Sequence, residues 1–447
     1  MDLIPKPEQV ATAAGNVFHK LLYGGVADLR LMPRTLIDEG EHREVYHYRP
    51  SKDAPSEGPA VLLVPPLAAP ALCFDLRRGC SLVEHLVKEG RPTYLVDYGQ
   101  ISFSSRNMGL EDWVQEIIPE AIRTVHTHSG NRPVHVVGWS LGGIFAVLTA
   151  AEHQDLPIAS VTVVGSPFDI RQVPLIAPFR PLLKYDGGLF TQAYRTLGGA
   201  PKPLVRRVFK LTSGSKLVTK PLAQLANLDD TEFLAQIEAV DRFTKNMAAY
   251  PGRSFGQLYH RMVKENDLVK GKLKFSDHTV NVADVRVPVL VFAGNTDGIS
   301  PVKAVKALVP LLKKSKEVRF EIVPGGHLGM LTGRASRTTT WVVMDEWFTK
   351  YSSLQLPKPP KTAKKKAAKK SAAATTEKAA SKKKPAKKAA AKKSTARKPT
   401  PKVAPAETDP TTERSSSSPD EIGSNPDRRF ASSSSRNLTA AKPPAGN

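Results

Sequence analysis

Short apolar runs alternate with helical patterns over much of the first 350 or so residues. Some runs have the length and β-branched composition of strands: Val61–Val64, Thr93–Val96, Val134–Val137, Ser160–Val164, Pro288–Ala293 and Val318–Val323. Other segments have helical spacing: Ser81–Glu89, Leu110–Thr127, Ile144–Ala151 and Val302–Leu312. This alternation predicts an α/β fold, a mostly parallel sheet with helices on both faces.

The N-terminal residues 1–50 show a helical pattern followed by a strand-like run, Glu44–Tyr48. Apolar residues recur at three- and four-residue spacing in the helix: Val10, Ala14, Val17, Phe18, Leu21 and Leu22. Such a helix could lie on a lipid surface or pack against the body of the domain. Because its polar face is not especially basic, we favour packing against the body.

The alternation stops between Ser166 and Ala283, where apolar and basic residues mix without a readable period. An insertion after the strand Ser160–Val164 is expected to form a cap over a functional site. The apolar residues of Pro174–Phe179 suggest an alternative contact with lipid. The predicted domains are 1–50 (N-terminal helix and extended segment), 51–165 (first part of the core), 166–283 (cap insertion), 284–354 (second part of the core) and 355–447 (tail).

The formal charge of +23 is concentrated near the C-terminus. Residues 358–402 hold 18 Lys and Arg and the single acidic residue Glu377, a net charge of +17. Phe430 is the only aromatic residue after Leu356, so residues 355–447 are expected to be disordered. Segment 358–402 is expected to bind DNA or anionic surfaces non-specifically through its charge, the alternative being a solvated tail without a partner.

The two cysteines, Cys73 and Cys80, imply no disulfide framework and favour a reducing compartment. The first residues lack the pattern of a secretory signal. The longest apolar stretch, His135–Ala151, divides into a strand and a helix, so no transmembrane segment is expected. These features predict a cytoplasmic protein, with lipid or polyester inclusions as a further site of association.

The most informative motif is Gly138-Trp139-Ser140-Leu141-Gly142, which lies between a strand-like and a helix-like run. This is the layout of a nucleophile elbow, a strained turn that exposes the serine Oγ. Glycines flank the serine because a Cβ there would strike the neighbouring backbone. The motif predicts Ser140 as a nucleophile.

A serine hydroxyl needs a base, and that base needs an acidic partner. Asp297 follows the strand that ends at Ala293, and His327 follows the strand that ends at Val323, in the hydrolase order Ser, Asp, His. A lone Asp in a glycine-rich loop is usually a turn residue, and most of the 11 histidines must be structural. Because the three motifs occur in order at strand ends, we predict a Ser140–His327–Asp297 triad.

An oxyanion hole requires two backbone N–H groups aimed at the developing negative charge. The residue after the nucleophile, Leu141, supplies the first. In the loop Pro65–Ala69 the two prolines have no N–H, so Leu67 is the first candidate for the second donor and Ala68 the fallback. The loop could equally be a rigid turn without a catalytic part.

From about Leu36 to Tyr351 the chain resembles the α/β-hydrolase proteins related to polyhydroxyalkanoate synthases, especially the short class. The resemblance includes Val45–Pro50, Leu63–Pro66, Asn266–Gly271, the Asp297 loop, Gly325–Gly329 and the Trp341–Trp347 helix. It implies an α/β-hydrolase fold. The polymerases of this group carry a cysteine nucleophile, whereas this chain has Ser140, and a serine forms an ordinary acyl ester that water can resolve.

The sequence therefore predicts a serine hydrolase, similar to lipases and esterases, that cleaves hydrophobic acyl esters such as storage lipid or polyester. One alternative is an acyltransferase or polymerase that keeps the synthase reaction. Another is a non-catalytic scaffold on lipid droplets or polyester granules, tethered to DNA by its tail. No metal-ligand cluster or phosphate-cradling loop is present in the sequence, so no cofactor is expected. Cys73 and Cys80 lack an elbow and are expected to be buried small residues.

Overall fold

A computed structural model describes residues 7–53, 58–179, 188, 192, 196, 199–212 and 221–352 of the chain. The expected disorder of residues 355–447, and the basic segment 358–402 within them, lie outside the described residues. Among those that are described, none forms a helix long and apolar enough to cross a bilayer.

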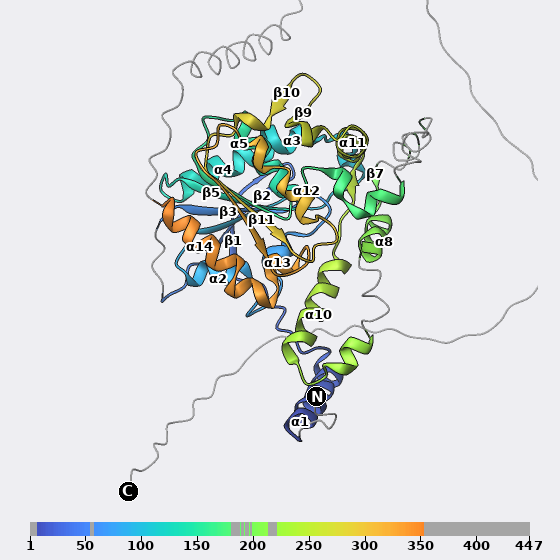
Figure 1. Cartoon of the computed structure of the whole chain (residues 1–447). Helices are drawn as coiled ribbons and strands as arrows, with labels where there is room; N and C mark the ends of the chain where they lie inside the picture. The colour runs from blue at the N-terminus through green and yellow to red at the C-terminus, as the bar shows by residue number, and fades with distance from the viewer. Residues whose placement is uncertain are drawn as a thin grey trace, which may run out of the picture. The chain divides into compact units, whose positions relative to one another are not determined.

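The centre of the molecule is a twisted eight-stranded sheet, in the order β1-β2-β4-β3-β5-β6-β11-β12 (Figure 1). Its strands are β1 (Arg34–Gly40), β2 (Arg43–Tyr48), β3 (Ala60–Val64), β4 (Thr93–Asp97), β5 (Val134–Trp139), β6 (Ile158–Val164), β11 (Val289–Gly294) and β12 (Val318–Val323). The strands from β4 to β12 pair in parallel, whereas β1 and β2 form an antiparallel edge. The predicted mostly parallel sheet is confirmed.

Every strand predicted from the apolar runs is present, with ends that differ by up to two residues. The edge strand β1 was not predicted. Its residues are half-buried or exposed and do not alternate in burial, so the sequence carries no period of two. A register shift between Leu36 and Asp38 also makes its pairing with β2 irregular. The strand β1 is recognised from its pairing with β2, because its own sequence has no alternating apolar pattern.

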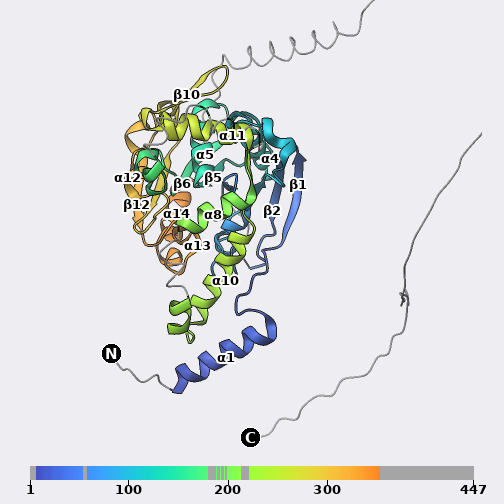
Figure 2. The same ribbon diagram turned by 90° about the vertical axis from the view of Figure 1, so that its right-hand side faces the viewer.

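Helices cover both faces of the sheet, as expected (Figures 1 and 2). One hydrophobic cluster holds side chains of α3 (Leu110–Asp112), the π-helical turn Trp113–Ile117, α4 (Ile118–His128), α5 (Leu141–Glu152) and α12 (Val302–Lys306). The other holds side chains of α2 (Leu82–Lys88), α13 (Gly329–Thr332) and α14 (Thr340–Lys350). Leu62 lies in the first cluster and Leu63 in the second, because successive strand residues face opposite sides.

The segment between β6 and β11 is mainly helical in its described part. It contains short pieces, Ile170–Gln172, Pro174–Phe179, β7 (Gly199–Ala200), β8 (Tyr250–Pro251), Leu258–Lys264, Asp267–Lys270, β9 (Lys272–Lys274), β10 (Thr279–Asn281) and Val282–Asp284. It also contains the α-helices α8 (Lys202–Thr212), α10 (Thr231–Lys245) and α11 (Gly252–Gln257). Ile176, in the segment for which lipid contact was the alternative interpretation, packs against the first hydrophobic cluster. The domain boundaries stay a prediction.

The N-terminal helix α1 (Pro7–Tyr23) forms where the spacing predicts it, but its apolar face does not pack against the body. Phe18, Leu21 and Leu22 are 64%, 79% and 59% exposed, and the only buried residue of the helix is the polar Asn16. The favoured interpretation of this helix is therefore wrong. The period of a helix identifies its apolar face but not which face the rest of the fold will cover.

Candidate active site

Ser140 lies in a strained turn between the last residue of β5 and the first residue of α5. Its φ of 56° and ψ of −123° are rarely adopted by a non-glycine residue, and such strain persists only where the surroundings impose it. Its N–H donates to the Val164 carbonyl at 2.8 Å, and its own carbonyl accepts from the Ser166 hydroxyl at 2.6 Å. These bonds hold the elbow against the end of β6.

The glycines of the elbow are required by the close approach of backbone. A Cβ on Gly138 would lie 2.4 Å from the Gly142 carbonyl oxygen. A Cβ on Gly142 would lie 2.2 Å from the Val64 carbonyl oxygen, and one on Gly143 would lie 2.2 Å from the Ser166 hydroxyl. No side chain fits at these distances, which explains the glycines on both sides of Ser140.

The structure brings the side chains of Ser140, His327 and Asp297 into one chain of hydrogen bonds. The Ser140 hydroxyl and His327 Nε2 are 2.9 Å apart, and His327 Nδ1 is 2.8 Å from Asp297 Oδ2. The three residues follow β5, β12 and β11, whose carboxyl ends meet at one edge of the sheet. With Nδ1 donating to the carboxylate, Nε2 can accept the serine proton.

Asp297 is held so that one oxygen is left for His327. Its Oδ1 accepts hydrogen bonds from the N–H groups of Ile299 and Ser300 at 2.8 and 2.9 Å. The carboxylate is fully buried, and the His327 side chain is only 6% exposed. A buried carboxylate that accepts two backbone bonds has a fixed orientation, which in turn fixes the imidazole.

Three residues that the sequence did not single out also shape the site. Trp139 donates from its indole N–H to the His327 carbonyl at 2.9 Å, and the two rings lie 5.0 Å apart. Gly165, at φ 60°, leaves space for the imidazole, because a Cβ there would lie 3.3 Å from His327 Nδ1. Asn295 accepts from the Gly325 N–H at 3.1 Å. Gly165 and Ser166 come directly after the parallel strand β6. Because sites form at the carboxyl ends of parallel strands, this position in the sequence could have identified them as site residues.

The proposed oxyanion donors lie on two segments that touch. A Cβ added to Gly142 would also lie 2.8 Å from the Pro65 carbonyl oxygen. The loop Pro65–Ala69 therefore packs against the start of α5. Among the hydrogen bonds of the described residues, neither the Leu141 N–H nor the Leu67 N–H is a donor. The Ala68 carbonyl accepts from the Ala248 N–H at 2.8 Å. The part of Leu141 and Leu67 in catalysis stays a prediction.

Apolar side chains of the insertion pack beside the site. The ring of Phe243, near the end of α10, lies 5.9 Å from the ring of Trp139. Other insertion residues belong to the same hydrophobic cluster as Phe243 and Trp139: Ala200, Val205, Ala239 and Met247. An apolar wall beside the half-buried Ser140 would suit the acyl chain of an ester.

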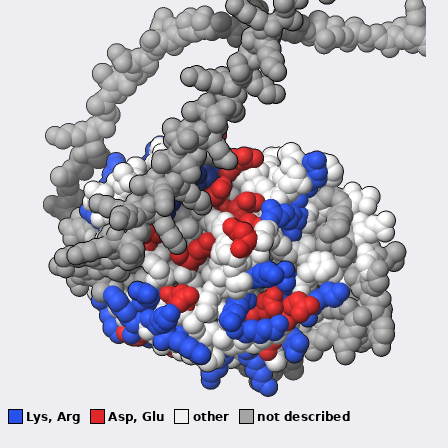
Figure 3. Space-filling view, turned by 90° about the horizontal axis from the view of Figure 1, so that it is seen from above, with Lys and Arg blue, Asp and Glu red and all other residues white. Residues whose placement is uncertain are grey.

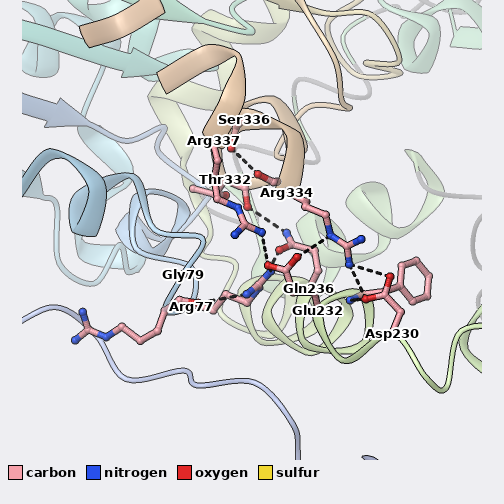
Figure 4. Close-up of polar contacts among 12 residues, drawn as sticks. Arg77, Gly79, Asp230, Glu232, Gln236, Thr332, Arg334, Ser336 and Arg337 are labelled. Carbon is pink, nitrogen blue, oxygen red and sulfur yellow. Dashed lines mark hydrogen bonds and ion pairs between the residues drawn. The ribbon is translucent and has the colours of Figure 1, made fainter. Parts of the chain in front are cut away.

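The start of α10 is attached to the His327 side of the site by a group of charged residues, here called the α10 clamp (Figure 4). Glu232 lies between Arg334, at 2.9 Å, Arg337 and Arg77, at 3.6 Å. Asp230 accepts from Arg334 at 2.6 Å. Arg334 and Arg337 belong to the turn Arg334–Thr338, directly after the helix α13 that begins two residues beyond His327.

Cys73 and Cys80 are buried and unpaired, as expected. Burial raises the pKa of both thiols, which makes them poorer nucleophiles. No group of three or more His, Cys, Asp or Glu side chains suited to a metal ion occurs within the described residues.

A separate cleft of about 690 Å³ opens between the turn Phe103–Asn107 and the α11 region. Basic side chains line much of it: Arg106, Arg253, Arg261 and Lys264. The turn Phe103–Asn107 follows β4, so this cleft also lies beyond a strand's carboxyl end.

A sequence profile of the family described as alpha/beta hydrolase fold matches residues 59–334. The chain is 21% identical over 345 residues to the poly(3-hydroxyalkanoate) polymerase subunit PhaC of Haloarcula marismortui, covering 73% of this chain and 69% of that one. It is 23% identical to PhaC of Allochromatium vinosum, covering 73% and 91%. It is 25% identical to PhaC of Cupriavidus necator, covering 66% and 50%.

Solved structures of similar fold include esterases. One from Thermogutta terrifontis is 15% identical with a TM-score of 0.42, over 72% of this chain and all of that one. A carboxyl esterase from Bacillus coagulans is 14% identical with a TM-score of 0.45, over 72% and 99%.

Proposed function

This chain belongs to the alpha/beta hydrolase fold family, and from that premise we propose that it is a serine hydrolase that cleaves hydrophobic acyl esters. The proposal rests on one observation, the continuous hydrogen bonding from Asp297 through His327 to Ser140. The apolar side chains beside Trp139 support a hydrophobic acyl group, of storage lipid or polyester type. Its location would be cytoplasmic, at lipid or polyester inclusions.

The reaction follows from the roles of the three side chains. His327 Nε2 takes the proton of the Ser140 hydroxyl as the oxygen attacks the ester carbonyl. Asp297 stabilises the imidazolium, and the N–H groups of Leu141 and Leu67 bind the oxyanion. His327 then protonates the leaving alcohol, which leaves an acyl ester on Ser140. A water molecule, activated by the same imidazole, releases the acid and restores the serine.

A second candidate function is acyl transfer or polymerisation. Several relatives are named poly(3-hydroxyalkanoate) polymerases, and the basic cleft beside α11 would suit the phosphates of an acyl-CoA. In that reaction a hydroxyl of a growing polyester replaces water as the acceptor of the acyl group. Acylation of Ser140 then breaks the thioester, and His327 protonates the CoA thiol as it leaves.

One experiment separates the candidates. The purified protein and its Ser140→Ala form are given a chain-length series of p-nitrophenyl esters and, separately, a 3-hydroxyacyl-CoA. Ester cleavage that is lost in the variant supports the hydrolase. Release of CoA together with polymer supports the polymerase. Activity in neither assay would leave a non-catalytic scaffold.

The basic segment 358–402 adds a proposed interaction with polyanions. Both signs of charge are interspersed over the described part of the face in Figure 3, whereas this segment carries a net charge of +17. Its binding to duplex DNA should weaken with salt, with a slope near 0.9 per phosphate neutralised. Retention of the full chain on immobilised DNA, compared with a chain that ends at Leu356, tests this directly; equal retention would reject it.

A further inference from the structure

The loop Pro65–Ala69 is almost fully buried but contains backbone N–H groups that are not hydrogen-bonded. Leu67 and Ala68 lie in the protein interior, and neither N–H donates a hydrogen bond within the described residues. Most buried backbone donors in proteins are paired. The Leu67 N–H therefore has no acceptor in the described chain, and its direction depends on what holds the rest of the loop.

Two carbonyl groups of this loop are hydrogen-bonded to residues outside it. The Tyr98 hydroxyl, one residue beyond the end of β4, donates to the Pro65 carbonyl at 3.0 Å. The Ala248 N–H of the insertion donates to the Ala68 carbonyl at 2.8 Å. The candidate oxyanion donor Leu67 lies between these two anchored carbonyl groups.

The first of these bonds restricts how the Leu67 N–H can turn. The Pro65 carbonyl belongs to the planar peptide that joins the two prolines, so the Tyr98 hydroxyl anchors that plane. The ring of Pro66 fixes its φ at about −65°. Only the ψ of Pro66 then remains free between the anchored plane and the Leu67 N–H. The Tyr98 hydroxyl consequently limits the direction of that N–H through the two prolines.

Tyr98 is itself held by packing. Its side chain is almost fully buried, and its ring lies edge-on to Trp113 with the ring centroids 6.0 Å apart. Trp113 in turn stacks on Phe145 of α5, the helix that begins directly after Ser140. Tyr98 is therefore connected both to the loop Pro65–Ala69 and, through Trp113, to the helix that follows the elbow.

The hydroxyl of Tyr98 stays protonated and can donate this bond at neutral and alkaline pH. Burial raises the pKa of Tyr98 well above its usual value. A phenylalanine at this position would fill the same space but would leave the Pro65 carbonyl without its donor. The hydroxyl can therefore be removed with little change in packing, which separates its role from that of the ring.

We propose that Tyr98 is a positioning residue for the oxyanion hole, holding the Pro65–Pro66 peptide so that the Leu67 N–H points to the carbonyl oxygen attacked by Ser140. The inference rests on the proposed function, because an oxyanion forms only when Ser140 adds to a carbonyl group. Without the hydroxyl, the direction of the Leu67 N–H is no longer fixed. Stabilisation of the transition state then falls, while binding of the substrate is unchanged.

The test compares Tyr98→Phe with the matched control Tyr94→Phe. Tyr94 is almost fully buried near the start of β4, and its hydroxyl lies 3.0 Å from His128 Nδ1. Each variant loses one buried hydroxyl and its hydrogen bond. Tyr98→Phe is expected to lower kcat on p-nitrophenyl butyrate at least tenfold with KM unchanged, whereas loss of a whole oxyanion donor costs roughly 10²- to 10³-fold. Tyr94→Phe is expected to keep the kcat of the parent.

A second measurement reports on the oxyanion directly. An alkyl trifluoromethyl ketone binds when the Ser140 oxygen adds to its carbonyl carbon, the serine proton passes to His327 Nε2 and the carbonyl oxygen becomes an oxyanion. The matching methyl ketone, which binds without this addition, measures binding of the ground state. Tyr98→Phe is expected to weaken the inhibition constant of the trifluoromethyl ketone at least tenfold and to leave that of the methyl ketone unchanged.

The outcomes separate this inference from the proposed function. Parental kcat and inhibitor affinity in Tyr98→Phe reject the positioning role, as do equal losses in Tyr98→Phe and Tyr94→Phe. If the parent cleaves no ester but binds the trifluoromethyl ketone at least tenfold more tightly than Tyr98→Phe does, the proposed function fails and the positioning role stands. If the parent does neither, both fail. Pro66→Ala frees the φ that the ring fixes and replaces Tyr98→Phe if that variant does not fold; parental kcat in Pro66→Ala would then reject the inference.

Discussion

The candidate active-site edge of the sheet and the α10–α1 region are held together by different forces. At the edge that carries Ser140, backbone atoms approach so closely that only glycine fits, and the side chains of His327 and Asp297 are almost fully buried. At the start of α10, the contacts are side-chain ion pairs, with Arg334 53% and Glu232 41% exposed. The first arrangement is steric and independent of solvent, whereas the second is sensitive to salt and pH.

This difference indicates which part of the molecule can change its position. Trp139 and Gly165 pack directly on His327, so a shift in the core would move the reacting atoms. Among the contacts of α10 with the core, the ion pairs of the α10 clamp can exchange with water at modest cost. A site that must admit a bulky ester is better served by movement of α10 than by movement of the elbow.

The largest effect on activity is expected from substitutions in the hydrogen-bonded series Ser140, His327 and Asp297. Ser140→Ala removes the nucleophile, and Asp297→Asn leaves the imidazole without its charged partner. Each should lower kcat on a soluble ester on the order of 10⁴-fold with little change in KM. Steady-state kinetics measures the loss, and an unchanged circular dichroism spectrum shows that the fold is intact. Activity of Ser140→Ala above a tenth of the parent would rule out this serine as the nucleophile.

Next in size is the steric effect at the elbow. Gly142→Ala would bring a Cβ to 2.2 Å from the Val64 carbonyl, so both stability and activity should fall. We expect a loss of about 3 kcal/mol in unfolding free energy. The matched control is Gly298→Ala in the Asp297 loop, where a Cβ would meet nothing within 4 Å. Urea unfolding of both variants tests the prediction, and equal stabilities would contradict it.

A smaller effect is expected at the α10 clamp. Glu232→Gln leaves the buried Arg77 guanidinium without its ion-pair partner, and one of its terminal nitrogens already has no hydrogen bond. The loss should be about 1 to 2 kcal/mol and local to α10. Hydrogen exchange of residues 231–245 should quicken in this variant. The control Glu346→Gln breaks the more exposed ion pair with Arg319 and should leave this exchange unchanged.

The clamp should also weaken in acid. For Glu232, burial opposes ionisation, but the Arg337 hydrogen bond and the charges of Arg337, Arg334 and Arg77 outweigh it, so the pKa is lowered from 4.5. The Arg334 hydrogen bond likewise lowers the pKa of Asp230 from 3.8. Both carboxylates stabilise the fold above these ordinary values, and the contribution disappears as pH falls through the lowered values. Exchange within α10 should therefore quicken below pH 4.5 in the parent but less so in Glu232→Gln.

The smallest effect is expected on α1. Because Phe18, Leu21 and Leu22 are exposed, their replacement by serine should change the unfolding free energy by less than about 0.5 kcal/mol for each substitution. Thermal unfolding of the F18S/L21S/L22S variant checks this. A loss of several kcal/mol would mean that these three side chains are covered by the protein itself.

Much of the core could be predicted because its signals are local. The strands β3, β5, β6 and β11 are buried on both faces and read as continuous apolar runs, and the order of strands and helices implies a parallel sheet. Ser140, Asp297 and His327 each carry a recognisable loop at a strand end, so their meeting at one edge followed from topology. The catalytic roles of these residues and of the N–H groups of Leu141 and Leu67 remain predictions.

What the sequence alone determined is the set of segments that fold and the order in which they form the sheet, because apolar period and glycine position act over a few residues. Only the tertiary structure decided which surfaces are covered. The exposed apolar face of α1, the edge strand β1, the α10 clamp and the contact of Trp139 with His327 all depend on partners distant in the chain. A helix shows its apolar face in its spacing, but its burial depends on what the rest of the chain places against it.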